Sequence, residues 1–313
     1  MRKITTLTLA GLLLFPVTSV FTACTNEDLS EDLENNSVES SASFNEDTPD
    51  SRCINMLVPK RVIEKAKEIY SQGSTGPQTI TTVNEMAIVT SINSARPTNG
   101  PISVTSASLN NEDITLITLG GTENKDGQAT GSKESGLASR GKSNDYLRAV
   151  VKLFEEKIIP EDKPVIVVGI SLGGMIAQQV IGEKLIMDNY NLRAVITFGS
   201  PLTMPIDRHG VKVVRFADVH DKVPGLGEGT LRSGLLTIGK LSLKKLRKTL
   251  KQLDETERVV RTSKYTGMIE THALSYIEDA CWNDVDFLGD AAKTNVLVLK
   301  EDMKFYPAPR LTK

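Results

Sequence analysis

This chain of 313 residues has few histidines and few cysteines, and its net charge is close to zero. A formal net charge of −2 offers no basic surface of the kind that nucleic acid requires, so we expect no nucleic-acid partner. The body of the sequence lacks an uncharged apolar run of roughly 18 residues, which a membrane-spanning helix needs. No spacing of cysteines, histidines and acidic residues is typical of a metal site, so we expect neither a metal nor a cofactor. A hydrophobic fraction of 39% and a charged fraction of 24% are ordinary for a globular protein with a real core.

The first residues differ from this body. Arg2 and Lys3 precede an uncharged, mostly apolar run from Ile4 to Ala23, which is the pattern of a secretory signal peptide. The run ends in Phe-Thr-Ala-Cys24, which resembles a bacterial lipobox, the signal in which the cysteine is lipidated after cleavage. We therefore expect a signal peptide over residues 1–23 and lipidation of Cys24. The alternative is an ordinary signal peptide that is cut near Ala23.

Residues 24–52 are acidic and poor in apolar side chains. The stretch 25–52 has nine acidic residues and one basic residue, so it cannot bury enough surface to offset its chain entropy. We expect a disordered tether here, followed by a folded domain over 53–313. An acidic run after a lipidated cysteine resembles the export signal of bacterial surface lipoproteins. It implies an outer-membrane or cell-surface lipoprotein of a Gram-negative bacterium. Outside the cytoplasm the remaining cysteines, Cys53 and Cys281, either form a disulfide or stay as free thiols.

Hydrophobic patterning over the body predicts strands that alternate with helices. Strands are expected at 85–91, 113–119, 165–168, 193–198, 211–216 and 295–299. Helices are expected at 59–70, 145–158, 172–187, 242–253 and 271–279. Residues 123–144 are rich in Gly, Ser, Lys and Asn, which predicts a long loop. This alternation favours the α/β class, with a mostly parallel central sheet and helices on both faces.

One short motif carries chemistry. Gly169-Ile170-Ser171-Leu172-Gly173 has the pattern Gly-x-Ser-x-Gly, and it follows an apolar strand and opens a helix. This is the context of a nucleophile elbow, in which a serine sits on a strained turn and glycines leave room for the tight backbone. The helix N-terminus behind the serine favours developing negative charge. The alternative is a plain strand-to-helix turn in which the serine only caps the helix.

Serine needs a base to act as a nucleophile, and the chain has only three histidines. His209 lies in an expected turn and His220 stands next to Asp221, whereas His272 follows every expected core strand but the last. Because the order in hydrolases of this type is Ser, then acid, then His, the base is expected to be His272. Asp218 and Asp221 both closely follow the strand 211–216, and strand-end position alone leaves both open as the acid.

Several segments, taken in order, resemble the class 3 lipase (fungal-lipase-like) family of the α/β-hydrolase fold. They are ITLGGT (Ile117–Thr122), VGISLGG (Val168–Gly174), ITFGSP (Ile196–Pro201), DKVP (Asp221–Pro224) and HALSY (His272–Tyr276). Together they cover about residues 113–280. The chain departs from the family at Gly120, where the family has an arginine in its oxyanion segment.

The resemblance implies a fold, a site and an activity. It implies an α/β-hydrolase with Ser171 as nucleophile and His272 as base, and it selects Asp221 over Asp218 as the acid. It also implies an oxyanion hole formed by the Leu172 N–H and by the N–H or hydroxyl of Thr122. The expected substrate is a lipid ester, either glyceride or phospholipid. The alternatives are a carboxylesterase or thioesterase for small soluble esters and a non-catalytic surface-binding lipoprotein.

Two further segments bear on the substrate. Residues 123–143 follow the oxyanion segment, where related lipases carry a lid, and the alternative is a surface loop. Residues Leu235–Leu253 pattern as an amphipathic helix with leucines on one face and six basic residues. Such a helix can lie on an anionic membrane or cap the site, and the alternative is a helix that packs on the body with a solvated face.

Overall fold

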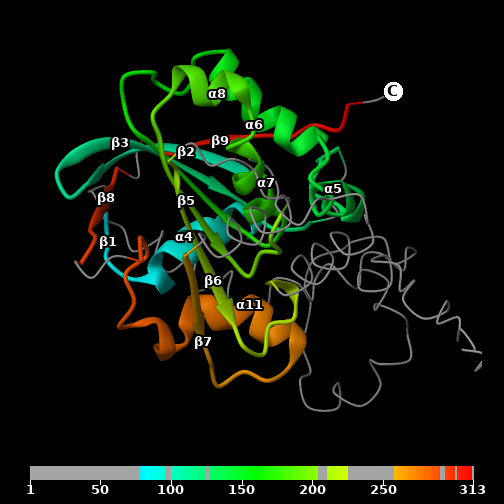
Figure 1. Cartoon of the computed structure of the whole chain (residues 1–313), viewed down its shortest axis with the longest axis vertical. Helices are drawn as coiled ribbons and strands as arrows, with labels where there is room; N and C mark the ends of the chain where they lie inside the picture. The colour runs from blue at the N-terminus through cyan, green and yellow to red at the C-terminus, as the bar shows by residue number, and fades with distance from the viewer. Residues whose placement is uncertain are drawn as a thin grey trace, which may run out of the picture. The chain divides into compact units, whose positions relative to one another are not determined.

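A mixed sheet forms the centre of the described structure (Figure 1). The computed structural model describes residues 78–95, 100–123, 127–203, 210–224, 257–289, 293–299 and 302–311. These residues all belong to a compact unit that spans Asn45–Lys313. Within them the sheet has nine strands in the order β1-β8-β2-β3-β4-β5-β6-β7, with β9 also paired to β2. The strands are β1 Gln78–Ile80, β2 Ile102–Leu109, β3 Glu112–Leu119, β4 Val165–Ile170, β5 Leu192–Phe198, β6 Lys212–Asp218, β7 Glu257–Arg261, β8 Val296–Val298 and β9 Lys304–Tyr306.

Helices cover both faces of this sheet, so the α/β class is what the structure shows. They are α4 Val83–Ala95, α5 Ser132–Ala138, α6 Asp145–Glu155, α7 Leu172–Val180, α8 Lys184–Asn189, α11 Met268–Glu278 and the 3₁₀ helix η1 Ala280–Trp282. Strands β3 to β7 run parallel to one another, whereas β2, β8, β1 and β9 are joined by antiparallel pairs. The expected parallel sheet is therefore one side of a mixed sheet, from β3 to the edge strand β7, and the antiparallel side from β1 to β2 was not expected.

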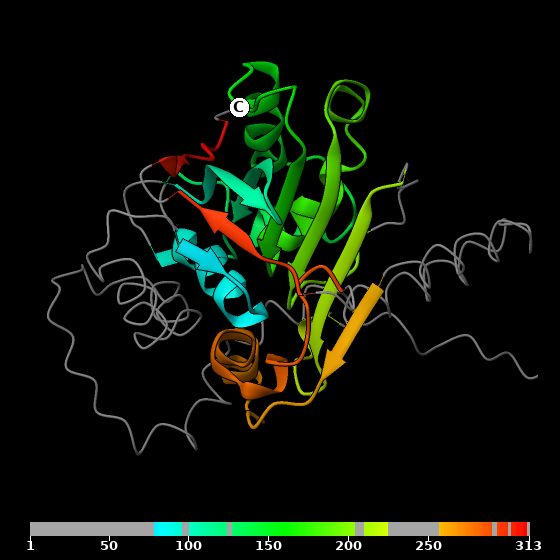
Figure 2. The ribbon, with the colours of Figure 1, turned by 90° about the vertical axis from the view of Figure 1, so that its left-hand side faces the viewer.

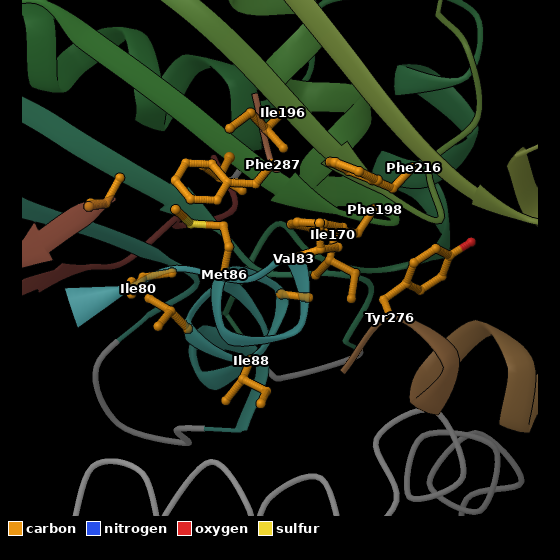
Figure 3. Packing of buried hydrophobic residues seen from close by; sticks show 14 of the residues in the cluster. Ile80, Val83, Met86, Ile88, Ile170, Ile196, Phe198, Phe216, Tyr276 and Phe287 are labelled. Carbon is orange, nitrogen blue, oxygen red and sulfur yellow. The ribbon is translucent and has the colours of Figure 1, made fainter. Parts of the chain in front are cut away.

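Strand β4 explains how the core is divided. Its even-numbered residues, such as Ile166 and Ile170, join a cluster that includes α4 and α11, which Figures 1 and 2 show side by side. Figure 3 shows Val83 and Met86 of α4 next to Ile170 in this cluster. Its odd-numbered residue Val167 joins the cluster on the other face, with residues of α6, α7 and α8. A strand that is buried on both faces reads as a continuous apolar run, which is how β4 reads in the sequence.

The strand expected at 85–91 is wrong, because these residues lie in α4. A short apolar run does not by itself distinguish a buried strand from a buried helix. The helix is set by a capping box in Thr82-Val83-Asn84-Glu85. The Glu85 N–H donates to Thr82 Oγ1 at 3.2 Å, and Glu85 Oε2 accepts from the Thr82 N–H at 3.1 Å. This reciprocal pairing satisfies two N–H groups at the helix start, and its Thr-x-x-Glu pattern is visible in the sequence.

Three other expectations need correction. The loop predicted over 123–144 contains the helix α5, and the single helix predicted over 172–187 is two helices, α7 and α8. The strand β2 was not predicted, because its serine-rich sequence has little hydrophobic signal. It pairs with β3 across a turn at Asn110 and Asn111, whose φ angles are 48° and 72°. Two consecutive positive φ values are typical of a tight hairpin turn, and asparagine tolerates them well.

The remaining expected elements agree with the structure within a few residues. The five other strands correspond to β3, β4, β5, β6 and β8, and the helices expected at 145–158 and 271–279 correspond to α6 and α11. Asn144 is the N-cap of α6, since its Oδ1 accepts from the Leu147 N–H at 2.9 Å. No helix within the described ranges is long and apolar enough to cross a membrane.

Several predictions fall on residues outside the described ranges. These are the signal peptide 1–23, the Cys24 lipidation site and tether 24–52, the helix 59–70 and the basic segment Leu235–Leu253. Cys53 also lies outside the described residues, whereas Cys281 has a free, half-buried thiol. Burial, together with Asp279, raises the pKa of that thiol to about 12.

Replacing Thr82 with alanine tests the capping box. We expect Thr82→Ala to lower the free energy of unfolding by about 1 kcal/mol, because the Glu85 N–H then loses its partner. Chemical denaturation measures the change. Thr82→Ser retains a hydroxyl and is the matched control. Equal stability of the alanine and serine variants would contradict this assignment of the helix start.

Candidate active site

Ser171 lies on a strained turn between β4 and α7. Its φ is 53° and its ψ is −118°, a combination that is costly for a residue with a side chain. The side chain makes no capping hydrogen bond to α7. The alternative in which this serine merely caps the helix therefore does not describe the structure. The backbone N–H of Ser171 donates to the Phe198 carbonyl at the end of β5, at 2.9 Å. This bond ties the turn to the neighbouring strand.

Two glycines allow this turn to pack closely. A Cβ on Gly169 would lie 2.3 Å from the carbonyl group of Gly173. A Cβ on Gly173 would lie 2.2 Å from the Leu119 carbonyl oxygen, at the end of β3. Both distances are far below van der Waals contact, so only glycine fits. The start of α7 consequently sits directly against the chain that leaves β3, and a Cβ on Gly121 would lie 3.5 Å from Ser171 Cβ.

Asp221 and His272 form a buried pair. Asp221 follows β6, His272 lies in α11, and His272 Nδ1 is 2.8 Å from Asp221 Oδ2. The same Oδ2 accepts from the Tyr276 hydroxyl at 2.7 Å, and Oδ1 accepts from the Val223 N–H at 2.9 Å. The Asp221 side chain is 0% exposed and that of His272 is 14% exposed. A carboxylate so buried needs several donors, and here it has three.

Asp218, the other acid that the sequence left open, has different partners. Its Oδ2 accepts from the Ser275 hydroxyl at 2.6 Å and from the Ser263 N–H at 3.1 Å. Its Oδ1 accepts from the His220 N–H at 2.8 Å. These bonds tie the loop after β6 to α11. The structure therefore pairs His272 with Asp221, while Asp218 holds the surrounding chain.

Two of the three candidate catalytic residues, Ser171 and Asp221, follow parallel strands at the same edge of the sheet, whereas His272 comes from α11. Ser171 follows β4, Gly199 follows β5 and Asp221 follows β6. Gly199, at a φ of 56°, connects them, because its Cβ position is 3.0 Å from Asp221 Oδ2 and 3.1 Å from His272 Cε1. Ser171 and His272 thus both contact the Phe198–Gly199 stretch. Within the described ranges the Ser171 hydroxyl makes no hydrogen bond to His272, and such bonds often tighten only with substrate.

The expected oxyanion donors differ in how free they are. Leu172 is the first residue of α7, so its N–H has no acceptor within the helix. The Thr122 hydroxyl is 3.1 Å from the Ser135 hydroxyl, which itself donates to the Gly131 carbonyl. Because Ser135 has a single proton, the Thr122 hydroxyl donates to it. The arrangement therefore favours the Thr122 N–H, rather than its hydroxyl, as the second donor.

The electrostatics of His272 reflect its partner. Burial of the ring lowers the pKa of His272, but the charge of Asp221 and their hydrogen bond raise it. The net effect is a pKa above the usual value of 6.5. The Tyr276 hydroxyl keeps its proton, because burial and the nearby Asp221 raise its pKa well above the ordinary range. Tyr276 is thus a fixed donor to Asp221.

Sequence reasoning assigned no role to Tyr276 or Gly199. Tyr276 follows His272 by four residues, so the two share a face of α11, and this spacing was an available signal.

The other two histidines are not paired with Asp221 in the described structure. His220 Nδ1 is 2.9 Å from the Tyr265 carbonyl, and His209 lies outside the described ranges. No group of three or more metal-ligating side chains occurs among the residues that the structure describes.

Comparisons with known proteins give no relative. No protein-family model, no curated protein and no solved structure matches the chain. An interpretation of the site therefore depends on its geometry and on the motifs in its sequence.

Asp221→Asn tests the charge that acts on His272. Because the folded-state pKa of His272 is raised, its proton stabilises the fold fully below about pH 6.5, and this contribution is lost as pH rises through the folded-state value. The asparagine variant should lose this part of the pH dependence, and NMR titration should show a lower His272 pKa. His272→Gln should lose the same part. An unchanged pH profile of unfolding in both variants would contradict the coupling.

Tyr276→Phe tests the hydrogen bond that the Tyr276 hydroxyl donates to Asp221. The ring and its stacking on Trp282 remain, but Asp221 loses one donor and becomes a better partner for a protonated His272. We expect the pKa of His272 to rise further in an NMR titration. Tyr190→Phe removes a hydroxyl that donates to the Phe154 carbonyl in the cluster on the other face of the sheet, and should leave this pKa unchanged. A lower His272 pKa in Tyr276→Phe would refute the assigned direction of the bond.

Proposed function

We propose that this protein is a serine hydrolase that cleaves carboxylic esters of lipids through an acyl-enzyme. The observation that carries the proposal is the buried Asp221–His272 pair beside a serine on a strained strand-to-helix turn. Strain of this kind persists where function requires it, and a serine hydrolase requires an exposed hydroxyl at this point. We likewise propose the α/β-hydrolase fold, since the nucleophile turn follows β4, a strand in the parallel part of the mixed sheet.

The mechanism follows from the roles of these groups. Neutral His272 takes the proton of Ser171 Oγ as Ser171 attacks the ester carbonyl, and Asp221 holds the ring and stabilises its cation. The oxyanion accepts from the N–H groups of Leu172 and Thr122. The carbon–oxygen bond of the ester then breaks, and His272 gives its proton to the leaving alcohol. Water attacks the acyl-enzyme with His272 as base, which releases the acid and restores Ser171.

The choice of lipid esters rests on the resemblance of five segments to class 3 lipases. We also propose that the protein is exported and is anchored to a membrane through Cys24, as the N-terminal pattern indicates. Short-chain soluble esters or thioesters are the competing substrates, and a binding lipoprotein without activity is the competing function. Both competing proposals give distinct results in the experiment below.

Ser171→Ala tests the nucleophile. Wild type should react with a fluorophosphonate probe and hydrolyse nitrophenyl esters, and the alanine variant should lose labelling and about four to six orders of magnitude in kcat. Ser143→Ala replaces an exposed serine and serves as the control. An unlabelled wild type, or equal labelling of Ser171→Ala, would refute the enzyme. Rates over a series of acyl chain lengths, together with a phospholipid, then identify the substrate; a sharp preference for acetate or butyrate would refute a lipase.

A further inference from the structure

The C-terminal segment 308–311 lies along the chain that follows the oxyanion segment. The Ala129 N–H donates to the Ala308 carbonyl at 2.7 Å, and the Arg310 N–H donates to the Gly127 carbonyl at 2.9 Å. The Ala308 N–H also donates to Gln128 Oε1 at 2.8 Å. Figure 1 shows this segment, in red, running from β9 toward α5. Because β9 pairs with β2, the segment joins one side of the sheet to the stretch 127–131.

The stretch 127–135 in turn holds the oxyanion segment. The Glu123 N–H donates to the Thr130 carbonyl at 2.8 Å, and the Thr130 hydroxyl donates back to the Glu123 carbonyl at 2.8 Å. The Thr122 hydroxyl pairs with Ser135 of α5. Glu123 and the Thr122 side chain are thus held by Thr130 and Ser135, and the residues that precede each of these, Ala129 and Glu134, contact the C-terminal segment. A displacement of 127–135 would move that N–H, and oxyanion donors act only within a narrow range of positions.

Glu134 makes the contact between α5 and the C-terminal segment costly to disturb. Glu134 is 0% exposed, and neither of its carboxylate oxygens has a hydrogen bond. Its ion-pair partner in the described part of the chain is Arg310, whose Nη2 is 4.0 Å from Glu134 Oε2. A buried carboxylate without a countercharge is strongly destabilising. Arg310 therefore supplies the charge that lets α5 remain in place with Glu134 inside.

We propose that the C-terminal segment is a positioning element of the oxyanion hole, and that Arg310 acts in it by neutralising the buried Glu134. The inference rests on the proposed ester hydrolysis and deepens it. Arg310 touches no reacting atom. It holds α5 and residues 127–131, which aim the Thr122 N–H at the oxyanion. Its loss should weaken stabilisation of the transition state more than binding of the substrate.

The test is Arg310→Met, which keeps an apolar stem and removes the charge. We expect kcat for a nitrophenyl ester to fall about tenfold, part of the hundredfold or more that loss of a whole oxyanion donor costs, with KM within twofold. The inhibition constant of a trifluoromethyl ketone should rise in step with the loss in kcat/KM, because this inhibitor mimics the tetrahedral intermediate. Arg193→Met removes the exposed ion pair with Glu112 and is the matched control. An unchanged kcat and inhibition constant in Arg310→Met would overturn the proposal.

A second variant covers the case in which Arg310→Met is simply unstable. Arg310→Met combined with Glu134→Gln has no buried charge to neutralise, so most of the lost kcat should return. If the double variant folds but stays as slow as Arg310→Met, the role assigned to Glu134 is wrong.

Amide hydrogen exchange separates this proposal from the proposed function. In Arg310→Met, exchange at residues 120–123 should accelerate, while exchange in β4 and β5 stays as in wild type. If wild type hydrolyses no ester, the proposed function fails and the exchange result alone decides the positioning role. Wild-type exchange rates at 120–123 in a folded Arg310→Met would overturn that role.

Discussion

The site depends on a buried negative charge, the carboxylate of Asp221. Three donors meet on it: the His272 ring and the Tyr276 hydroxyl, both from α11, and the Val223 N–H two residues along the chain. A buried carboxylate is tolerable only with such partners, so its burial fixes the position of α11 over the end of β6. The pair that would drive catalysis and the packing of α11 are thus one arrangement.

A single face of α11 binds both aspartates at the end of β6, Asp218 and Asp221. His272 and Tyr276 bind Asp221, while Ser275 between them binds Asp218. The Tyr276 hydroxyl also accepts the Asp218 N–H at 3.0 Å, so one phenol connects the two. Asp218 therefore orients the loop that carries Asp221. Asp221 binds His272, and Asp218 binds the surrounding chain. These separate roles explain why two aspartates lie within four residues although only Asp221 pairs with the histidine.

Close backbone approach is the second requirement of the site. Gly173 lets α7 press against the end of β3, and Gly199 leaves room for Asp221, His272 and Tyr276. The Gly120 N–H donates to the Pro101 carbonyl, and the Gly120 carbonyl accepts from the Tyr146 hydroxyl. The chain that leaves β3 is therefore tied both to the residue before β2 and to α6.

The local elements could largely be read from the sequence, and the exceptions have physical reasons. Apolar runs bounded by turns predicted β3 to β6, because strands buried on both faces have a strong signal. The run at 86–89 was misread because its four apolar residues fit either element, and the capping box at Thr82 and Glu85 decided for a helix. Helix α5 was missed because its seven residues have a polar, loop-like composition. Its Glu134 is buried and pairs with Arg310 of the C-terminal segment, a long-range contact that no local pattern contains.

The sequence by itself determined the strand, the turn and the helix around Ser171, because adjacent residues specify that geometry. Tertiary structure decided the rest. His272 and Asp221 are 51 residues apart, and only packing of α11 against β6 brings them to 2.8 Å. Packing likewise chose Asp221 over Asp218, since both follow the same strand and only one reaches the imidazole. The partner of the Thr122 hydroxyl, Ser135, was likewise decided by packing, because a hydrogen-bond partner can be assigned only when the segments that carry both groups are in contact.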